Sequence, residues 1–437
     1  MNMRRVVISG TGAVTPYGNG IPAYWKGILS GHGAATPITS FDVTSLPTHF
    51  AAQVPFSDRE LEEFIENKKA TKTMSRAARF AAIAANEAVR QGNLDTHALD
   101  PWRFGTCVGT GGLGFFDVEY SDKLLEIFLR SVRVEDGKAT FDAGQVRRNT
   151  LDMVHPLTPL KALQNILTAH IAIQFNARGV CQTVTTACTS AAQAVGEAYR
   201  IVRTGAADVV ITGGSDSMVN PNGVVAFSAI GVISKNNDEY RTASRPFDNR
   251  RDGFMIGEGA AMFVIETLEH CLARGAVPLA EIIGYGSTCD AYRLTDPPPD
   301  GRGCIEAMRL ALRDAEIDAT EVDYINAHGT GTRMNDKTET MAIHTVFGNN
   351  AVPPVSSTKS MIGHLVAAAG AVELAACVLA LQHQIMPPTI NYREPDPDCD
   401  LDYVPNEARK AHLETVLTNS FGFGGQNATI VIRKPPL

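Results

Sequence analysis

Residues 182–192, with the sequence QTVTTACTSAA, have the pattern of a β-branched strand that passes through a turn into a helix of small residues. Residues 355–365, VSSTKSMIGHL, repeat this order of strand, turn and small-residue helix. Around both segments, short β-rich runs alternate with alanine-rich helical runs, which is typical of an α/β protein whose helices cover sheets. The two segments therefore suggest that one structural pattern occurs twice in the chain.

Three more pairs of segments occur in the same order along the chain. They are residues 5–12 with 280–287 (RVVISGTG and AEIIGYGS), 104–111 with 324–331 (FGTCVGTG and YINAHGTG), and 208–214 with 416–422 (DVVITGG and VLTNSFG). Chance similarity between αβ segments would also produce such pairs, but the common order favours two related α/β halves. We place their boundary near Val277, after an expected helix at residues 268–274, which gives halves of residues 1–276 and 277–437.

The composition favours a globular protein and disfavours several other classes. Of the 437 residues, 44% are hydrophobic and 20% are charged, which is ordinary for a globular chain. The formal net charge of −8 is unlike that of most nucleic-acid binders, so we expect no nucleic-acid partner. The eight cysteines include no C-x-x-C pair, which disfavours a zinc ribbon or a disulfide scaffold and fits a reducing compartment.

The longest apolar stretch, residues 365–381, contains Glu373 and many alanines. A buried helix therefore explains this stretch better than a membrane span. The apolar run at residues 6–9 is too short for the hydrophobic region of a signal peptide. We therefore expect a cytoplasmic protein that has no membrane partner.

Several residues that can carry chemistry follow expected strands. In open α/β sheets, ligands bind beyond the carboxyl ends of the strands. The expected strand ends here lead to Cys188, His328, Lys359 with His364, and the glycine-rich residues 419–427. We therefore expect these residues to gather where the two halves face each other.

Cys188 lies between an expected strand and an expected helix at residues 190–202. Unpaired N–H groups at a helix N-terminus lower the pKa of a thiol, which favours the nucleophilic thiolate. Small neighbours, among them Ala187 and Ala191, leave room for a substrate. A buried structural cysteine is the alternative, and the position alone does not decide between the two.

His328 and His364 are weaker candidates when each is taken alone, because a histidine in a loop or at a helix end is often simply solvated. Glu373 strengthens the case, because it is a carboxylate within an apolar helix. A buried carboxylate without a partner is unfavourable, so a cation should contact it. Lys359 or a histidine of the site is the natural candidate, unless the glutamate lies on an exposed helix face.

Two glycine-rich segments offer backbone N–H groups. Residues 419–427, NSFGFGGQN, connect two expected strands and can bring N–H groups to a developing oxyanion, although a tight structural turn is the alternative. Residues 109–114, GTGGLG, match a G-x-G-x-x-G pattern that can hold a dinucleotide. We disfavour a dinucleotide site, because the pattern does not follow the first strand and no convincing acidic residue follows about twenty residues later.

Four motifs together resemble the β-ketoacyl-acyl-carrier-protein synthases, most closely synthase II of dissociated fatty acid synthesis. They are TACTS around Cys188, NAHGTGT around His328, TKSMIGH at residues 358–364 and NSFGFGG at residues 419–425. The resemblance covers nearly the whole chain. It implies a thiolase-like fold, in which two related α/β halves form a layered αβαβα arrangement. It also implies a dimer, usually a homodimer, with a heterodimer containing a related chain as the alternative.

The resemblance implies a reaction and a role for each residue. Cys188 would take the acyl group from an acyl carrier protein, and His328 and His364 would hold malonyl-carrier protein during its decarboxylation. The resulting carbanion would attack the acyl thioester in a Claisen condensation. The other implied roles are support of the histidines by Lys359 and Glu373, an oxyanion hole from the N–H groups of Cys188 and Phe423, and substrate binding by Thr330, Thr332, Phe423 and Gly424. No metal and no cofactor of the enzyme's own are expected, because the phosphopantetheine arm arrives on the carrier protein.

The chain departs from the family pattern in three places. Residues 115–157 are longer than the corresponding region of synthase II enzymes, which lies near the dimer interface and the acyl tunnel. Gln426 stands where threonine is common, and Gly231 stands where an arginine often contacts the carrier protein. Fatty acid elongation is our first prediction, and a type II polyketide or polyene ketosynthase is the alternative. A non-catalytic chain-length partner typically lacks the cysteine, whereas a thiolase uses coenzyme A thioesters and a second cysteine, so we disfavour both.

An acidic carrier protein needs a basic surface on the enzyme. The candidates form a cluster at helical spacing, with a solvated helix face as the alternative: Lys68, Lys69, Lys72, Arg76 and Arg79.

Overall fold

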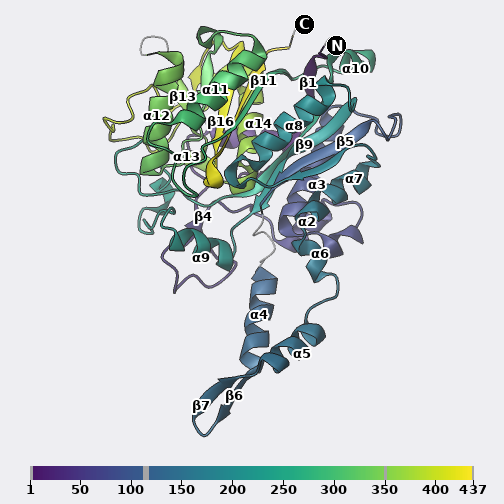
Figure 1. Cartoon of the computed structure of the whole chain (residues 1–437), viewed down its shortest axis with the longest axis vertical. Coiled ribbons are helices and arrows are strands. Elements are labelled where there is room, and N and C mark those ends of the chain that lie inside the picture. Colours follow the sequence, from purple (N-terminus) through teal and green to yellow (C-terminus); the bar gives the residue numbers. More distant parts are fainter. Residues whose placement is uncertain (1–2, 112–117, 349–351, 436–437) are drawn as a thin grey trace.

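The computed structural model of the chain describes residues 3–111, 118–348 and 352–435. Residues 112–114 of the G-x-G-x-x-G segment and residues 115–117 of the expected insert lie outside these ranges. Within them, the chain forms one main sheet whose two halves are covered and separated by helices (Figure 1).

The main sheet has a nearly symmetrical strand order. From one edge to the other, its hydrogen-bonded path runs through β8 (Cys181–Val184), β5 (Phe104–Thr110), β9 (Val209–Ser217), β10 (Glu258–Thr267), β1 (Val6–Thr15), β11 (Ala280–Cys289), β17 (Gln426–Arg433), β16 (Thr415–Phe421), β12 (Tyr324–Asn326) and β13 (Val355–Ser356). The three strands nearest each edge are parallel to one another. The central strands pair in antiparallel fashion.

The repeated sequence segments occupy equivalent places in this order. Counted outward from the centre, β1, β9, β5 and β8 correspond to β11, β16, β12 and β13. This correspondence agrees with the four pairs found in the sequence, and the predicted α/β fold with two related halves is confirmed. The boundary near Val277 falls between α10 (Leu268–Ala273) and β11, and as a domain boundary it remains a prediction.

Two buried helices lie between the halves of the sheet. Both α8 (Ser190–Arg203) and α14 (Ala369–His383) contact strands of the two halves. The outer face of the first half is covered by α3 (Arg76–Gln91) and α7 (Gln164–Phe175). On the second half lies α11 (Arg302–Ala315), with α12 (Arg333–Phe347) packed against it. The layers therefore follow the predicted αβαβα order.

Small residues let the central helices approach their neighbours closely. A Cβ atom on Gly109 would lie 2.4 Å from the backbone nitrogen of Ala191, and one on Gly370 would lie 2.8 Å from the Cβ of Ala192. A close-packed interior cannot absorb such overlaps without a backbone shift. The small residues around Cys188 therefore serve first to pack α8 between the strands and α14.

One helical stretch in the described residues, Val366–His383, is long and apolar enough to cross a membrane by length and composition. However, 89% of it is buried inside the protein. It comprises η5 (Val366–Ala368) and α14, whose residues from Ala369 to Leu381 are all buried. The expected buried helix is therefore observed as the central helix of the fold.

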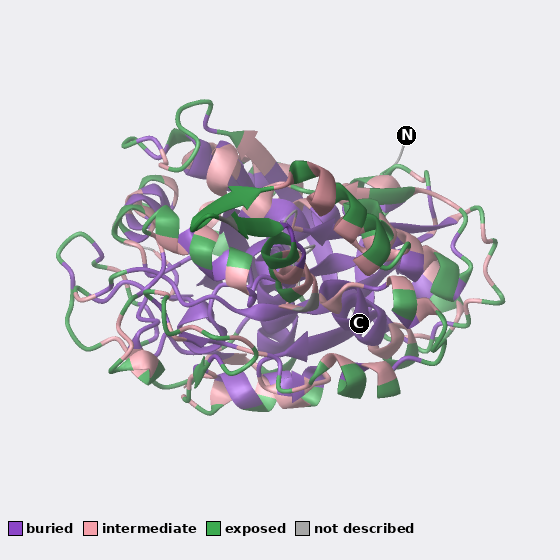
Figure 2. Ribbon diagram, turned by 90° about the horizontal axis from the view of Figure 1, so that it is seen from below, coloured by how far each residue is buried: buried purple, intermediate pink, exposed green. Residues whose placement is uncertain are grey.

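The remaining elements are short and lie around this core; Figure 2 shows the buried sheet and central helices surrounded by more exposed segments. They are β2 (Gly18–Asn19), α1 (Ile21–Leu29), β3 (Thr36–Pro37), β4 (Phe50–Ala51), α2 (Asp58–Glu63), η1 (Ala70–Thr73), α6 (Thr158–Ala162), η2 (Ala187–Thr189), α9 (Pro221–Ala229), η3 (Tyr240–Thr242), η4 (Ala319–Glu321), α13 (Lys359–Ile362), β14 (Ile385–Met386), β15 (Arg409–Lys410) and η6 (Phe423–Gly425).

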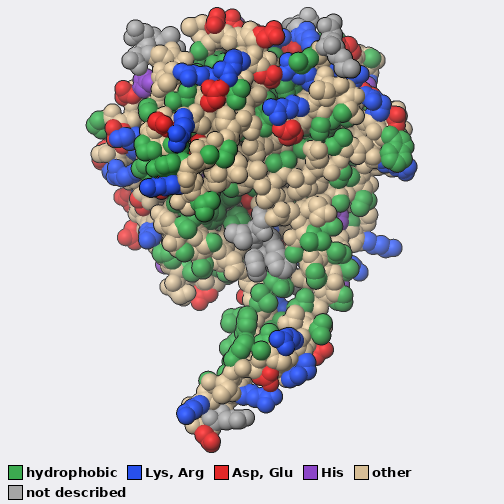
Figure 3. All heavy atoms as spheres, in the orientation of Figure 1, with side chains coloured by type: hydrophobic (Ala, Val, Ile, Leu, Met, Phe, Trp, Pro, Cys, Tyr) green, Lys and Arg blue, Asp and Glu red, His purple; other side chains and the backbone are tan. Residues whose placement is uncertain are grey.

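The described part of the expected insert forms an arm, residues 118–153, that projects from the body of the protein (Figure 1). The arm consists of α4 (Val118–Arg130), a hairpin of β6 (Val132–Glu135) and β7 (Lys138–Phe141), and α5 (Ala143–Met153), which packs against α4. Figure 3 shows hydrophobic side chains along it. Those that are exposed are Leu125, Phe128, Leu129, Val132, Val134, Phe141 and Leu151. Exposed apolar surface of this extent is a sign of an interaction surface.

Candidate active site

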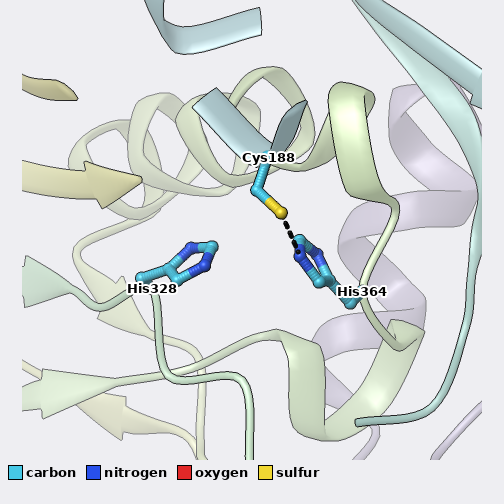
Figure 4. Close-up of side chains that lie close together, drawn as sticks. All are labelled: Cys188, His328 and His364. Atoms are coloured by element: carbon cyan, nitrogen blue, oxygen red, sulfur yellow. Dashed lines mark hydrogen bonds between the residues drawn. The ribbon is translucent and has the colours of Figure 1, made fainter. Parts of the chain in front are cut away.

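Three reactive side chains from distant parts of the sequence meet between the two halves (Figure 4). Cys188 lies in η2, His328 follows β12, and His364 lies between α13 and η5. The sulfur and one ring nitrogen of each histidine all lie within 4.8 Å of one another. His364 Nε2 lies 3.0 Å from Cys188 Sγ, and the two imidazole rings are 5.3 Å apart at 84°. The expected gathering of these residues is therefore observed.

The turn that presents Cys188 is held in an unusual backbone conformation. Ala187, directly before the cysteine, has a φ of 52°, which is uncommon for a residue with a side chain. Ser190 Oγ accepts a hydrogen bond from the Thr186 N–H at 2.8 Å and donates one to the Ala187 carbonyl at 2.7 Å. These contacts fix the turn, so that the thiol points towards the histidines rather than into the helix packing.

The expectation that the helix N-terminus lowers the pKa of Cys188 is wrong in this structure. Burial raises the pKa of the thiol to about 12, although the charge of Lys359 and the N–H of Phe423 act in the opposite direction. The cysteine lies in η2, before the first residue of α8. The loss of water thus outweighs the charge of Lys359 and the N–H of Phe423. The thiol must lose its proton when it reacts, and His364 Nε2 is placed to accept it.

Both histidines are neutral in this environment. Burial and the charge of Lys359 hold the pKa values of His328 and His364 well below the ordinary histidine value. A neutral imidazole has one N–H donor and one free nitrogen. The pair can therefore donate hydrogen bonds to a carbonyl oxygen, or accept a proton, without first losing a charge.

Lys359 is the cation that contacts Glu373, one of the two alternatives considered from the sequence. The Nζ of Lys359 donates to Glu373 Oε1, and both side chains are 1% exposed. Burial raises the pKa of Glu373 to about 7, against the lowering effect of Lys359. The positive charge of Lys359 also lowers the pKa values of both imidazoles, so the pair is close enough to influence the histidines.

The glycine-rich loop after β16 lies against Cys188. A Cβ on Gly422 would be 3.4 Å from the Cys188 nitrogen, and the N–H of Phe423 interacts with the thiol. The loop is held from outside by a 2.7 Å hydrogen bond from the Gly424 N–H to the Leu294 carbonyl. Backbone N–H groups of Cys188 and Phe423 thus converge on one region, as an oxyanion hole requires.

A cavity of about 470 Å³ connects these residues with the surface. Its walls include Cys188, both histidines and Phe423, and also Thr330 and Thr332, whose hydroxyl oxygens lie 3.0 Å apart. Gly424, expected to contact substrate, does not line the cavity; the space on its side-chain face is taken by Gln426 Oε1.

Two buried carboxylates near the site were not predicted. Glu339 on α12 accepts hydrogen bonds from the N–H groups of His328 and Gly329, both at 2.8 Å, and burial raises its pKa to about 7. Asp216 accepts a 3.0 Å bond from the Ala367 N–H in η5. Glu339 follows Asp336 at helical spacing after the histidine loop, and this pair of acids was an available signal. No pattern distinguishes Asp216.

The basic residues chosen as a carrier-protein surface do not form one cluster at helical spacing. Lys68 and Lys69 precede η1, Lys72 lies in η1, and all three are exposed. Arg76 lies in α3, where it donates to Glu258 at 2.7 Å and to Asp58 at 2.9 Å. Arg79 pairs with Asp58 and Glu62. Both arginines are therefore committed to internal ion pairs, and Arg76 is removed from the candidate surface.

Comparisons with known proteins agree with this arrangement. The sequence matches the family descriptions "Beta-ketoacyl synthase, N-terminal domain" over residues 3–271 and "Beta-ketoacyl synthase, C-terminal domain" over residues 279–393. It is 39% identical over 435 residues to 3-oxoacyl-acyl-carrier-protein synthase 2 of Synechocystis sp., covering 99% of both chains. It is also 39% identical over 437 residues to the ketoacyl synthase alpha subunit of the tetracenomycin polyketide synthase of Streptomyces glaucescens, covering 99% of this chain and 97% of the relative.

A solved structure gives the same result for the fold. It is a complex of a type II polyketide synthase acyl-carrier protein with its ketosynthase, bound to the hexaketide. One of its chains superposes on this chain with a TM-score of 0.86 at 32% identity, covering 99% of this chain and 100% of that one.

Proposed function

This chain belongs to the beta-ketoacyl synthase family, and from that premise we propose that it catalyses the decarboxylative condensation of an acyl thioester with malonyl-acyl-carrier protein in fatty acid elongation. The observation that carries the proposal is the convergence of the Cys188 thiol with two neutral imidazoles, those of His328 and His364, at the end of one cavity. A nucleophile, a proton acceptor and hydrogen-bond donors are thereby available together.

In the first half-reaction, Cys188 takes the acyl group. Its Sγ attacks the thioester carbonyl of the acyl-carrier protein while its proton passes to His364 Nε2, 3.0 Å away. The N–H groups of Cys188 and Phe423 donate to the oxyanion. The intermediate then expels the pantetheine thiolate, which takes the proton from His364, and the acyl group remains on Cys188.

In the second half-reaction, the two histidines bind the malonyl thioester. Their N–H groups donate to its carbonyl oxygen, and the bond to the carboxylate breaks to release carbon dioxide and leave an enolate. The enolate carbon attacks the acyl–Cys188 carbonyl, and the Cys188 thiolate leaves and takes up a proton that enters from solvent through the cavity. The charge of Lys359, balanced by Glu373, keeps the imidazoles neutral and favours the negative enolate.

The substrate arrives on a flexible arm, so the enzyme uses no cofactor of its own. Thr330 and Thr332 line the cavity and can bind the amides of phosphopantetheine through their hydroxyl groups. We propose this binding role for the two threonines. We also propose that the protein is cytoplasmic and has no nucleic-acid partner.

A ladder of acyl-carrier-protein thioesters with malonyl-carrier protein tests the function. We expect the purified chain to elongate saturated acyl chains. Condensation of β-keto or polyene chains alone would assign it to polyketide or polyene synthesis. The polyketide synthase relative is as similar to this chain as the synthase 2 relative, at 39% identity each. If no acyl chain is condensed, with or without a related second chain, the proposal is wrong.

We expect the carrier protein to bind at Lys68, Lys69 and Lys72. Reversal of Lys68 and Lys69 to glutamate should raise the KM for the acyl-carrier protein by about tenfold or more at low ionic strength, because opposite charges steer an acidic partner. The kcat should change little.

Two controls separate this effect from general damage. Lys410→Glu, an exposed lysine on β15, should leave the KM unchanged. An acyl-pantetheine substrate without the protein part should be used equally well by the double variant. A KM that is unaffected at every salt concentration would contradict this surface.

The assembly is proposed to be a homodimer that uses the arm and the open edge of the main sheet. Within the described residues β8 pairs with β5 on one side only, and its residues Cys181 and Gln182 are exposed. An open strand edge and the exposed apolar side chains of the arm each favour association with a second chain, and two-fold symmetry allows β8 to pair with its own copy.

We expect light scattering to give twice the chain mass, and Leu125→Asp with Leu129→Asp on the arm to give a monomer. Leu272→Asp, a change at an exposed leucine on α10, is the matched control and should stay dimeric. A wild-type monomer that dimerises only with a related chain would instead indicate a heterodimer.

A further inference from the structure

The side chains of Cys188, His328 and His364 have the composition of a zinc site. Thiolate sulfur and imidazole nitrogen are the ligands that zinc prefers, and sites with three protein ligands keep a fourth position for water or a small ligand. Within the described residues, these three side chains form the one group of cysteine, histidine or acidic residues whose donor atoms lie close enough to hold a metal ion.

The distances need only a small adjustment for tetrahedral coordination. Bonds of about 2.0 Å to nitrogen and 2.3 Å to sulfur place ligand atoms roughly 3.3–3.5 Å apart in a tetrahedral site. Here the sulfur lies 3.0 Å from His364 Nε2, and no pair of the three donor atoms is more than 4.8 Å apart. Donor atoms at the 4.8 Å limit would have to approach one another by about 1 Å to close the set around an ion.

The hydrogen bonding of the histidines leaves their rings free to do this. The Nδ1 atoms of His328 and His364 are buried and, among the described residues, have no hydrogen-bond partner. Each ring can therefore take either tautomer and present a lone pair to the cavity that both rings line. The cavity reaches the surface, so a hydrated ion has a path to the site.

We propose that Zn²⁺ binds reversibly to Cys188, His328 and His364 and thereby inhibits the enzyme. Binding forms one Zn–S and two Zn–N bonds, the S–H bond breaks, and the thiol proton leaves through the cavity to solvent. The fourth position is filled by water facing the cavity. The nucleophile and both donors are then occupied, so neither half-reaction can proceed. The inhibition rests on the proposed function, whereas the binding itself does not.

The surrounding charges act in both directions. Lys359 repels a cation, while Asp216 and Glu373 act on the thiol as negative charges. The thiolate formed on binding removes one of the two positive charges of the ion. An acyl group on Cys188 removes the thiolate, so we expect the acyl-enzyme to bind zinc much more weakly than the free enzyme.

The test uses the full chain, reduced and freed of metal, with ZnCl₂ and CoCl₂ as probes. We expect one Zn²⁺ per chain by calorimetry, a Co²⁺ spectrum with thiolate charge-transfer bands and tetrahedral bands, and inhibition of condensation that EDTA reverses. Cys188→Ala, His328→Gln and His364→Gln should each lower the affinity at least about tenfold, since even loss of an outer partner of a ligand has an effect of this size.

The matched control removes the two exposed thiols, in Cys181→Ala with Cys289→Ala, and should bind Zn²⁺ as the wild type does. Thermal unfolding checks that each variant is folded. A Co²⁺ spectrum without thiolate bands, or zinc affinity that survives Cys188→Ala, would overturn the proposal. Because binding is measured without acyl substrates, this result is independent of whether the chain condenses them.

Discussion

Replacement of Cys188 by alanine is expected to abolish condensation, with a loss on the order of 10⁴–10⁶-fold, the range found when the nucleophile or its partners are removed from other covalent enzymes. Decarboxylation of malonyl-carrier protein should continue, because that step breaks a carbon–carbon bond in a thioester held by the histidines and needs no thiol. The same variant thus loses one half-reaction and keeps the other.

For His328→Ala we expect the reverse result, in which decarboxylation is lost and acyl transfer is kept. Its ring nitrogen belongs to the set around the sulfur, but the nitrogen that contacts the thiol at 3.0 Å is that of His364. Acyl transfer to Cys188 should therefore persist in His328→Ala, whereas decarboxylation should fall on the order of 10²–10³-fold, the usual effect of removing one oxyanion donor.

Mass spectrometry of the intact protein measures acyl loading, and release of labelled carbon dioxide measures decarboxylation. Cys181→Ala is the control, because it removes a thiol on the exposed edge strand β8. If Cys188→Ala still acquires an acyl group, or if His328→Ala decarboxylates at the wild-type rate, the division of roles is wrong.

The convergence of Cys188, His328 and His364 could be predicted because it follows from topology. Each residue comes after a strand in one of two similar series, and the strand ends of both series meet between the halves of the sheet. The repeated pattern was visible in short β-branched runs. These runs are strands in the structure and occur in the predicted order, although the exact ends of the strands differ from the prediction.

The ionisation state of Cys188 could not be predicted in the same way. Its position before α8 was correct, but the pKa depends on how completely the surrounding chain excludes water, and this burial comes from residues far away in the sequence. Arg76 gives a similar case. Its partner Glu258 is 182 residues away, so its sequence neighbourhood suggested a free basic surface that the fold does not leave free.

Glu339 and Asp216 were missed for a related reason. Both act through backbone N–H groups, those of His328, Gly329 and Ala367, rather than through side chains that form a motif. An acidic residue in a helix or strand is most often solvated, and only the packing identifies the few that hold a loop in place.

The buried pair of Lys359 and Glu373 gives the largest expected effect on stability. We expect Lys359→Met and Glu373→Leu each to lower the free energy of unfolding by about 3–5 kcal/mol, because each leaves one buried charge without its partner. Lys337→Met is the matched control. Its partner is Asp398, and because that pair is exposed and screened by solvent its loss should have a much smaller effect.

The two variants should differ in how their stability depends on pH. In Lys359→Met the remaining carboxyl group can take up a proton, since burial already raises the pKa of Glu373 to about 7 and the lysine charge that lowers it is gone. A carboxyl group whose pKa is higher in the folded state binds protons more tightly there. Its ionisation therefore opposes folding as pH rises above its ordinary pKa of 4.5 and up to the folded-state pKa, which without Lys359 lies above the wild-type value of about 7. We therefore expect Lys359→Met to be less stable at pH 8 than at pH 6, by more than the wild type is.

Glu373→Leu lacks the carboxyl group that takes up the proton, so its loss of stability relative to the wild type should not grow from pH 6 to pH 8. Urea unfolding of both variants, the control and the wild type at pH 6 and pH 8 measures the free energy of unfolding of each protein. Subtraction from the wild-type value gives the loss of stability of each variant at each pH. An equal deficit for Lys359→Met at both pH values would mean that Glu373 stays ionised when its partner is removed. The histidines would then face a negative charge that the wild-type site neutralises, and their pKa values would rise rather than remain low.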